Sequence, residues 1–225
     1  MAEKDSKQAK ISDHEEQVDR LSALPDEILH QILYRFATKF AGTTSVLSSR
    51  WRSLWKSAPF LNLDSDPYRG SKSGNSDFEN FVGTVLSLRD RVADVDSFRF
   101  VYVFPLRRRT DCDPLNSAID YAVAHKVKYC LLYLRAAQGN LSIFPQSIFL
   151  CKSLKILRLR GGYGAFRFKP SKLAKALSAS NLKTLYLDYC KFKGCQGMNV
   201  RTFRSRTFGS IPLKQGSGLR FVLQS

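Results

Sequence analysis

Cysteine and histidine are the residue types of this chain that could form a metal site or a catalytic nucleophile. They are spread along the sequence, at Cys112, Cys130, Cys151, Cys190, Cys195, His14, His30 and His125. Zinc ligands usually come in pairs about two to four residues apart, and the chain has no C-x-x-C pair and no histidine near its last two cysteines. The spacing therefore predicts reduced, mostly buried thiols and no metal site.

Nucleophilic catalysis needs a serine or cysteine beside a histidine and an orienting acid. The three histidines lie in unrelated acidic or helical contexts, so no such set can be assembled by local spacing. We therefore predict no catalytic residue, no cofactor and no enzyme activity.

Positive charge is concentrated in the last third of the chain. The sequence has 36 lysines and arginines against 19 acids, a net charge of +17, and residues 150–225 hold 16 of the basic residues with Asp188 as their only acid. A basic surface favours an acidic or polyanionic partner. Many of these charges alternate with leucine, as in KSLKILRLRGG (152–162), and alternation also marks the solvent face of a strand. Binding of nucleic acid or another polyanion is therefore the alternative function.

The length and composition fit a folded protein of one or two domains. The chain has 225 residues, of which 44% are hydrophobic, enough for a core without disulfides or metal. No stretch approaches the roughly 18 uncharged apolar residues of a membrane helix, and the N-terminus lacks the apolar segment of a secretory signal. We expect no membrane association and a location in the cytoplasm, the nucleus or both.

A polar tail, residues 1–18, precedes a segment with the features of a first helix. Pro25 can occupy the first helical position, where its missing N–H costs nothing, and Asp26 and Glu27 then lie in the positively polarised first turn. The apolar residues that follow have the spacing of one helical face: Ile28, Leu29, Ile32, Leu33 and Phe36. The tail is predicted to be disordered and the helix to begin at Pro25.

Two further short helices are expected before Pro59, which ends the segment. Thr38 is a candidate cap for the second helix, and Ser48 or Ser49 for the third. The third helix places its large apolar residues on one side, namely Trp51, Leu54 and Trp55. Such a group of helices could be a docking module covered by a partner, a helical cap packed on the rest of the chain, or a helix-turn-helix that reads DNA.

Three runs in this helical segment follow a known pattern. They are LSALPDEILHQIL (21–33), TSVLSSRWRSLW (44–55) and PFLNLD (59–64). In this order they resemble the F-box of plant F-box proteins that continue into leucine-rich repeats. Residues 19–64 are therefore predicted to form an F-box-like module of three helices.

The stretch between the first two runs departs from the family's usual sequence. The chain reads FATKFAGTT, so that Ala37 replaces a common proline, Phe40 an acidic residue and Gly42 a valine. Glycine inside a helix costs about 1 kcal/mol relative to alanine. The departure predicts a weakened second helix more than a changed docking edge.

The resemblance implies a role in protein ubiquitination. In that family the F-box helices dock on a Skp-type linker subunit, and through it on a cullin–RING ubiquitin ligase, while the repeats hold a substrate protein. By matching positions, docking is expected to involve Leu24, Pro25, Ile28, Leu29, Ile32, Leu47, Trp51 and Trp55. The chain is thus expected to be a substrate-recognition adaptor, and the sequence does not name its substrate.

Short apolar segments recur after the helical module. The pattern L-x-x-L-x-L, read loosely, begins at positions 95, 127, 154 and 182, so that successive starts differ by 32, 27 and 28 residues. A period of this length indicates a leucine-rich repeat solenoid, in which each unit has one short strand and one helical or irregular segment that leads to the next strand. The repeat region is predicted over 77–192, after a Gly/Ser-rich linker at 65–76. Helices capped by Ser76 and by Asp113 are expected before the first two strands.

Alternate side chains of each repeat strand should face the core and the solvent. Arg158 and Tyr186 are expected to point outward and are the candidate substrate-binding residues, while the inward positions are Leu157, Leu159, Leu185 and Leu187. The periodicity stops after Phe192, so 193–225 is predicted to be a basic, disordered tail. The predicted fold class is α/β, with an F-box-like helical module followed by a short leucine-rich repeat solenoid.

Overall fold

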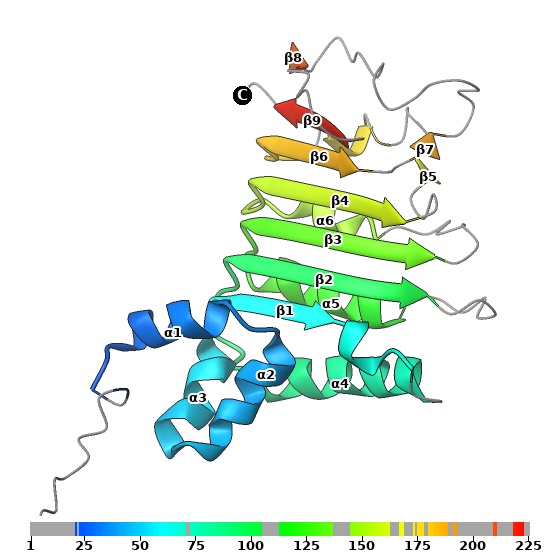
Figure 1. Cartoon of the computed structure of the whole chain (residues 1–225). Helices are drawn as coiled ribbons and strands as arrows, with labels where there is room; N and C mark the ends of the chain where they lie inside the picture. Colours follow the sequence, from blue (N-terminus) through cyan, green and yellow to red (C-terminus); the bar gives the residue numbers. More distant parts are fainter. Residues whose placement is uncertain are drawn as a thin grey trace, which may run out of the picture.

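The computed structural model describes most of the chain between residues 21 and 192 and two short segments beyond. The described residues are 21, 23–70, 73–104, 113–136, 145–162, 167–168, 173, 175–177, 180–188, 191–192, 209–210 and 218–222. They form an N-terminal group of helices and a sheet that begins directly after it (Figure 1). The predicted disordered tail 1–18 lies outside the described residues.

Three α-helices form the N-terminal module, as the sequence predicts. They are α1 (Asp26–Tyr34), α2 (Thr38–Thr43) and α3 (Ser49–Ser57), with the 3-10 helix η1 (Thr44–Val46) between the last two. Pro25 occupies the N-cap of α1 rather than its first position, a one-residue difference of the size usual at helix ends. Leu29 and Leu33 are buried, so one face of α1 belongs to the core.

The second helix forms in spite of its unusual sequence. Ala37 is its N-cap and makes no side-chain bond, so the predicted threonine cap is wrong. The Oγ1 of Thr38 instead accepts a hydrogen bond from the backbone N–H of Asn62 at 2.9 Å, which connects α2 to the first strand. Nothing lies within 4 Å of the position that a Cβ on Gly42 would occupy, so packing does not require glycine there.

The centre of the molecule is a parallel sheet whose strands follow one another in sequence order. The neighbouring strands are β1 (Phe60–Asp64), β2 (Ser97–Phe104), β3 (Tyr129–Ala136), β4 (Ile156–Gly162) and β6 (Thr184–Asp188). Figure 1 shows them stacked from the helical module toward the C-terminal end. Two short strands, β5 (Arg167–Phe168) and β7 (Lys191–Phe192), pair separately. The predicted α/β architecture with an N-terminal helical module is confirmed.

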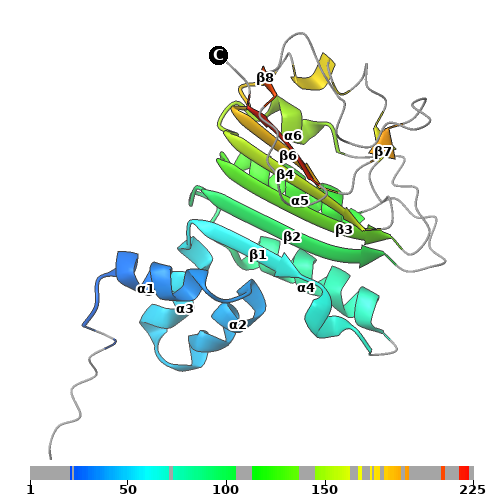
Figure 2. The same ribbon diagram turned by 45° about the horizontal axis from the view of Figure 1, so that its top comes forward.

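Helices between the strands lie on one face of the sheet (Figure 2). α4 (Gly74–Leu88) connects β1 to β2, α5 (Asp113–Ala124) connects β2 to β3, and α6 (Ser147–Leu150) precedes β4. Crossovers between parallel strands are almost always right-handed, so a sheet that grows in one direction places all its helices on one side. The opposite face of the sheet carries no helix in the part of the chain that the structure describes.

The register of the sheet places the predicted inward leucines in shared rows. Leu157 lies opposite Cys130 on β3 and opposite Leu185 on β6. The next row contains Leu132, Leu159 and Leu187. All these side chains are at most 3% exposed and belong to one core that also includes the helical module. The inward orientation predicted for these strand leucines is therefore confirmed.

Three predicted boundaries need correction. The linker 65–76 contains the 3-10 helix η2 (Asp66–Tyr68) and the start of α4. The N-cap of α4 is Ser73, so the capping box predicted at Ser76 is wrong. In the predicted disordered tail 193–225, the structure has two strands, β8 (Gly209–Ser210) and β9 (Gly218–Val222), and β9 pairs antiparallel with β6. The rest of that tail lies outside the described residues.

Candidate functional site

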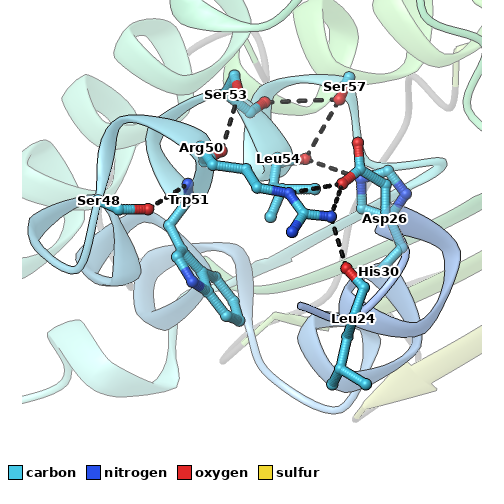
Figure 3. A network of polar contacts seen from close by, with 9 residues as sticks. All are labelled: Leu24, Asp26, His30, Ser48, Arg50, Trp51, Ser53, Leu54 and Ser57. Carbon is cyan, nitrogen blue, oxygen red and sulfur yellow. Dashed lines mark hydrogen bonds and ion pairs between the residues drawn. The ribbon is translucent and has the colours of Figure 1, made fainter. Parts of the chain in front are cut away.

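A polar network fixes α1 against α3 (Figure 3). Arg50 of α3 donates from Nε to Oδ1 of Asp26 at 3.0 Å and from Nη2 to the backbone carbonyl of Leu24 at 2.6 Å. Nε2 of His30 lies 3.0 Å from the carbonyl oxygen of Leu54. Exposed ion pairs contribute about 1 kcal/mol or less, so the network mainly sets the angle between the two helices.

The start of α3 is held by the predicted serine cap. Oγ of Ser48 accepts a hydrogen bond from the backbone N–H of Trp51 at 3.4 Å (Figure 3). A serine in this position stabilises a helix by about 1 kcal/mol. The cap therefore supports the short helix that carries both tryptophans.

Three of the eight predicted docking residues are core residues. Leu29, Trp51 and Trp55 are 0%, 5% and 7% exposed and pack in the same cluster as the leucines of the sheet. Leu24 is partly buried against that cluster. The three buried side chains thus support the module from inside and are not accessible to a partner in this structure.

The other four predicted docking residues lie at the surface. Pro25 is exposed, Ile28 and Ile32 are 40% and 36% exposed one turn apart on α1, and Leu47 is 61% exposed after η1. These side chains are apolar and reachable from solvent, as a docking residue must be.

The module also exposes large apolar residues that are not among the predicted docking residues. Phe36, Phe40 and Val46 are 47%, 53% and 86% exposed. Phe40 could have been singled out from the sequence, because an aromatic residue stands there in place of the acidic residue of the family pattern. We use the name exposed apolar set for Ile28, Ile32, Phe36, Phe40, Val46 and Leu47. Single exposed apolar residues are normal on a protein surface, but six large ones within residues 28–47 are more than such scatter explains, which favours a partner-binding surface.

A buried arginine joins the helical module to the sheet. Arg89, directly after α4, is 4% exposed, and its guanidinium donates to the backbone carbonyls of Trp55 (3.1 Å), Ala58 and Phe60 (3.2 Å). Its Nε donates to the hydroxyl of Tyr121 at 3.3 Å. These carbonyls lie at the end of α3, in the turn after it and at the start of β1, so Arg89 satisfies carbonyls at the negatively polarised end of α3.

Burial lowers the pKa of Arg89, while the nearby Tyr121 and Asp90 act in the opposite direction. An arginine side chain stays protonated in proteins, so this is a buried charge compensated mainly by carbonyl dipoles. The local sequence gives no signal for the role, because LRD (88–90) reads as an ordinary helix end.

Two ring contacts add to this connection. The Nζ of Lys39 in α2 lies 4.1 Å from the ring centroid of Tyr68 in η2. Tyr34 of α1 meets Phe60 of β1 edge to face, with ring centroids 5.4 Å apart. The module is therefore held against the sheet through all three of its α-helices.

The predicted substrate-binding residues lie together on the open face of the sheet, the face opposite the helices. Arg158 on β4 and Tyr186 on β6 are register partners, and the guanidinium carbon of Arg158 lies 5.5 Å from the ring centroid of Tyr186. Arg158 is exposed and Tyr186 half-buried, in contrast to the leucines beside them. Their outward orientation is confirmed, and binding of a substrate by them stays a prediction.

The described ranges hold no group of three or more histidines, cysteines, aspartates or glutamates that could bind a metal ion. Cys130 and Cys151 are free, buried thiols, as predicted, and burial raises the pKa of Cys130 above its usual range. The other three cysteines lie outside the described residues. No helix in the described part is long and apolar enough to cross a membrane.

Comparison with protein families identifies the helical module. Residues 21–63 match the F-box domain. This stretch contains α1, α2, η1, α3 and most of β1, so the match ends where the module joins the sheet.

The whole chain is similar to plant proteins of Arabidopsis thaliana. It is 34% identical to F-box/LRR-repeat protein 13, over 89% of this chain and 42% of that protein. It is 31% identical to an F-box/FBD/LRR-repeat protein, over 100% of this chain and 48% of that relative. It is 33% identical to another F-box/LRR-repeat protein, over 83% of this chain and 60% of that relative. The chain spans about half the length of the curated relatives it matches. No solved structure matches it.

Proposed function

The chain carries an F-box domain and is a homologue of the plant F-box/LRR-repeat proteins, and from this premise we propose that it is the substrate-recognition adaptor of a Skp–cullin–F-box type ubiquitin ligase. The F-box module docks on a Skp-type linker subunit, and the remainder binds a protein substrate. We expect this adaptor to act in the cytoplasm, the nucleus or both.

The exposed apolar set is the observation that carries the docking proposal. Its six members belong to the F-box module, between α1 and the turn after η1, and each is 36% to 86% exposed. Interface cores are enriched in aromatic and apolar residues of this kind. Covering them with a partner removes apolar surface from water, which stabilises the complex by about 25 cal/mol for each Å².

We further propose that the parallel sheet and its helices form a short leucine-rich repeat arc. Support comes from the strand starts at intervals close to 30 residues and from the leucine rows shared by consecutive strands. In such an arc each repeat is stabilised mainly by its neighbours. The arc presents its open strand face to the substrate.

The mechanism of the proposed adaptor is proximity. An adaptor that holds a substrate beside a ubiquitin-conjugating enzyme raises the effective concentration of the substrate without supplying an acid, a base or a nucleophile. The ties between module and sheet, through Arg89, Thr38 and Lys39, support this role because a defined angle keeps the substrate at a defined place.

Docking is expected to depend on the exposed apolar set. Ile32→Asp combined with Leu47→Asp should weaken binding of a purified Skp-type subunit by at least about 2 kcal/mol, the level of an interface hot spot. Titration calorimetry with the full chain measures the affinity. Trp51→Ala should instead lower the melting temperature, because Trp51 is buried.

The matched control is Val92→Asp combined with Leu150→Asp, which adds the same two charges at apolar residues that are 87% and 69% exposed outside the module. This variant should bind the Skp-type subunit as the unchanged chain does. Full binding by the Ile32/Leu47 double variant would contradict the assigned surface.

The alternative function, binding of a polyanion by the basic last third, makes a different prediction about salt. Binding dominated by phosphate contacts weakens by about 10³- to 10⁵-fold between roughly 50 and 200 mM salt. Apolar docking of the F-box module should change by less than about tenfold over the same range. The affinities for a Skp-type subunit and for duplex DNA, measured over one salt series, therefore separate the two functions.

A further inference from the structure

The open face of the sheet carries arginines that are held in place by neighbouring strands. Nη1 of Arg99 on β2 donates to Oδ1 of Asn62 at 2.7 Å and to Oδ2 of Asp64 at 2.9 Å, both on β1. Nε of Arg158 on β4 donates to Oδ2 of Asp188 on β6 at 2.9 Å. A guanidinium has five N–H donors. The hydrogen bonds described here use at most two of them in Arg99 and in Arg158.

A third arginine is held by an aromatic ring. The guanidinium carbon of Arg160 on β4 lies 5.0 Å from the ring centroid of Tyr133 on β3. Arg160 is also the register partner of Asp188 on β6, so the ring and this carboxylate lie on opposite sides of it. Arg135 on β3 adds a further positive charge to the same face, since its position alternates with the buried Leu134.

The acids of this face lie deeper than the arginines they hold. The side chain of Arg99 is 41% exposed and that of Asp64 is 16% exposed. For Arg158 and Asp188 the values are 47% and 14%. The carboxylates therefore orient the guanidinium groups from below, and in each pair the guanidinium is the group that a partner meets first.

Apolar and aromatic side chains separate the arginines. Arg99, Leu131 and Arg158 lie in one cross-strand row on β2, β3 and β4. Tyr133 and Arg160 lie in the next row. Neighbouring strands are about 4.8 Å apart, so the Cα atoms of Arg99 and Arg158, which are two strands apart in this row, are roughly 10 Å from each other. Leu131 lies between them, and the two guanidinium groups lean outward, toward β1 and β6.

We propose that this face binds an acidic segment of a protein, in which an apolar residue stands between carboxylates. The carboxylates pair with Arg99, Arg158 and Arg160, since guanidinium groups match carboxylates in two-point hydrogen bonds. The apolar residue packs on Leu131 and Tyr133. This inference rests on the proposed adaptor function and names the chemistry of its substrate.

The same geometry argues against nucleic acid on this face. Proteins that bind single strands stack bases on open aromatic rings, whereas the rings of Tyr133 and Tyr186 are each covered on one side by a guanidinium. Asp64 and Asp188 lie among the arginines and would repel a continuous phosphate backbone. A protein segment can place its acids where the guanidinium groups are and avoid both carboxylates.

The test uses the full chain and a fluorescein-labelled peptide of repeated Glu-Leu-Glu units, with fluorescence anisotropy as the readout. Arg158→Gln combined with Arg160→Gln should weaken peptide binding at least about tenfold, because charge-assisted hydrogen bonds are lost. Arg158→Lys with Arg160→Lys keeps the charge but loses the planar fork, so an intermediate loss is expected. A peptide with glutamine in place of glutamate should not bind measurably.

The control is Lys152→Gln combined with Lys155→Gln, which removes the same charge at exposed residues ahead of β4 and should leave peptide affinity within about twofold. Three results would overturn the inference. They are no peptide binding by the unchanged chain, equal loss of affinity in the arginine-to-glutamine and lysine-to-glutamine double variants, and an oligothymidine of matched length that binds as tightly as the peptide.

The binding of a Skp-type subunit separates this inference from the proposed function. The arginine variants should bind that subunit normally. If the chain binds the peptide but not the Skp-type subunit, the adaptor role is refuted and the inference about the acidic ligand stands. If it binds the Skp-type subunit but not the peptide, only the inference about the ligand is refuted.

Discussion

Arg89→Met is expected to lower the free energy of unfolding by about 3 kcal/mol or more. The substitution keeps most of the apolar stem but removes the donors to the carbonyls of Trp55, Ala58 and Phe60. A buried polar group left without a partner costs about 1–3 kcal/mol. Urea unfolding, followed by tryptophan fluorescence, measures the change.

Two other variants make the Arg89 experiment specific. Arg91→Met removes an exposed arginine two residues later and should change stability by no more than about 0.5 kcal/mol. Arg89→Lys keeps a charge but cannot reach three carbonyls with a planar fork, so it should lie between the unchanged chain and Arg89→Met. Equal stability of the Arg89→Met and Arg91→Met variants would show that the carbonyls find other donors.

Leu157→Ala is expected to destabilise the sheet region by about 2–5 kcal/mol, the range for truncating a buried leucine. Leu157 is fully buried between Cys130 and Leu185 on the adjacent strands. The cavity would therefore open at the interface of three consecutive strands and lower the melting temperature of the whole sheet. Leu185→Ala should act in the same way, and differential scanning calorimetry measures both.

The neighbouring outward residues supply the comparison. Arg158→Ala and Tyr186→Ala should each leave the melting temperature close to that of the unchanged chain, because their side chains reach solvent and surface substitutions usually change stability by less than about 0.5 kcal/mol. Similar destabilisation by the inward and outward substitutions would contradict the orientation of β4 and β6.

Local patterns were enough to predict most of the elements. The positions of Pro25, Ser48 and Pro59 delimit helices that the structure confirms within a residue or two. The L-x-L pairs predicted both the strands and their inward face. These predictions succeed because capping and alternation depend on residues a few positions apart.

Predictions that depended on choosing between nearby serines and threonines were less successful. α4 starts from Ser73 rather than Ser76, and Thr38 bonds to the first strand instead of capping α2. Either residue could cap a helix, so local chemistry alone does not decide between them. For Thr38 the partner depends on the strand that lies beside the helix, whereas the hydroxyl of Ser73 donates to Asp77 within α4.

The sequence by itself determined the types and order of most elements, the F-box pattern and the spacing of the apolar strand segments. Only the tertiary structure decided which apolar residues of the module reach a partner, since Trp51 and Trp55 are buried while Phe40 and Val46 are exposed. It alone revealed Arg89, whose four acceptors lie 29 to 34 positions away in the sequence. The physical reason is that periodicity reports on a single element, whereas burial and long-range hydrogen bonds depend on how separate elements pack together.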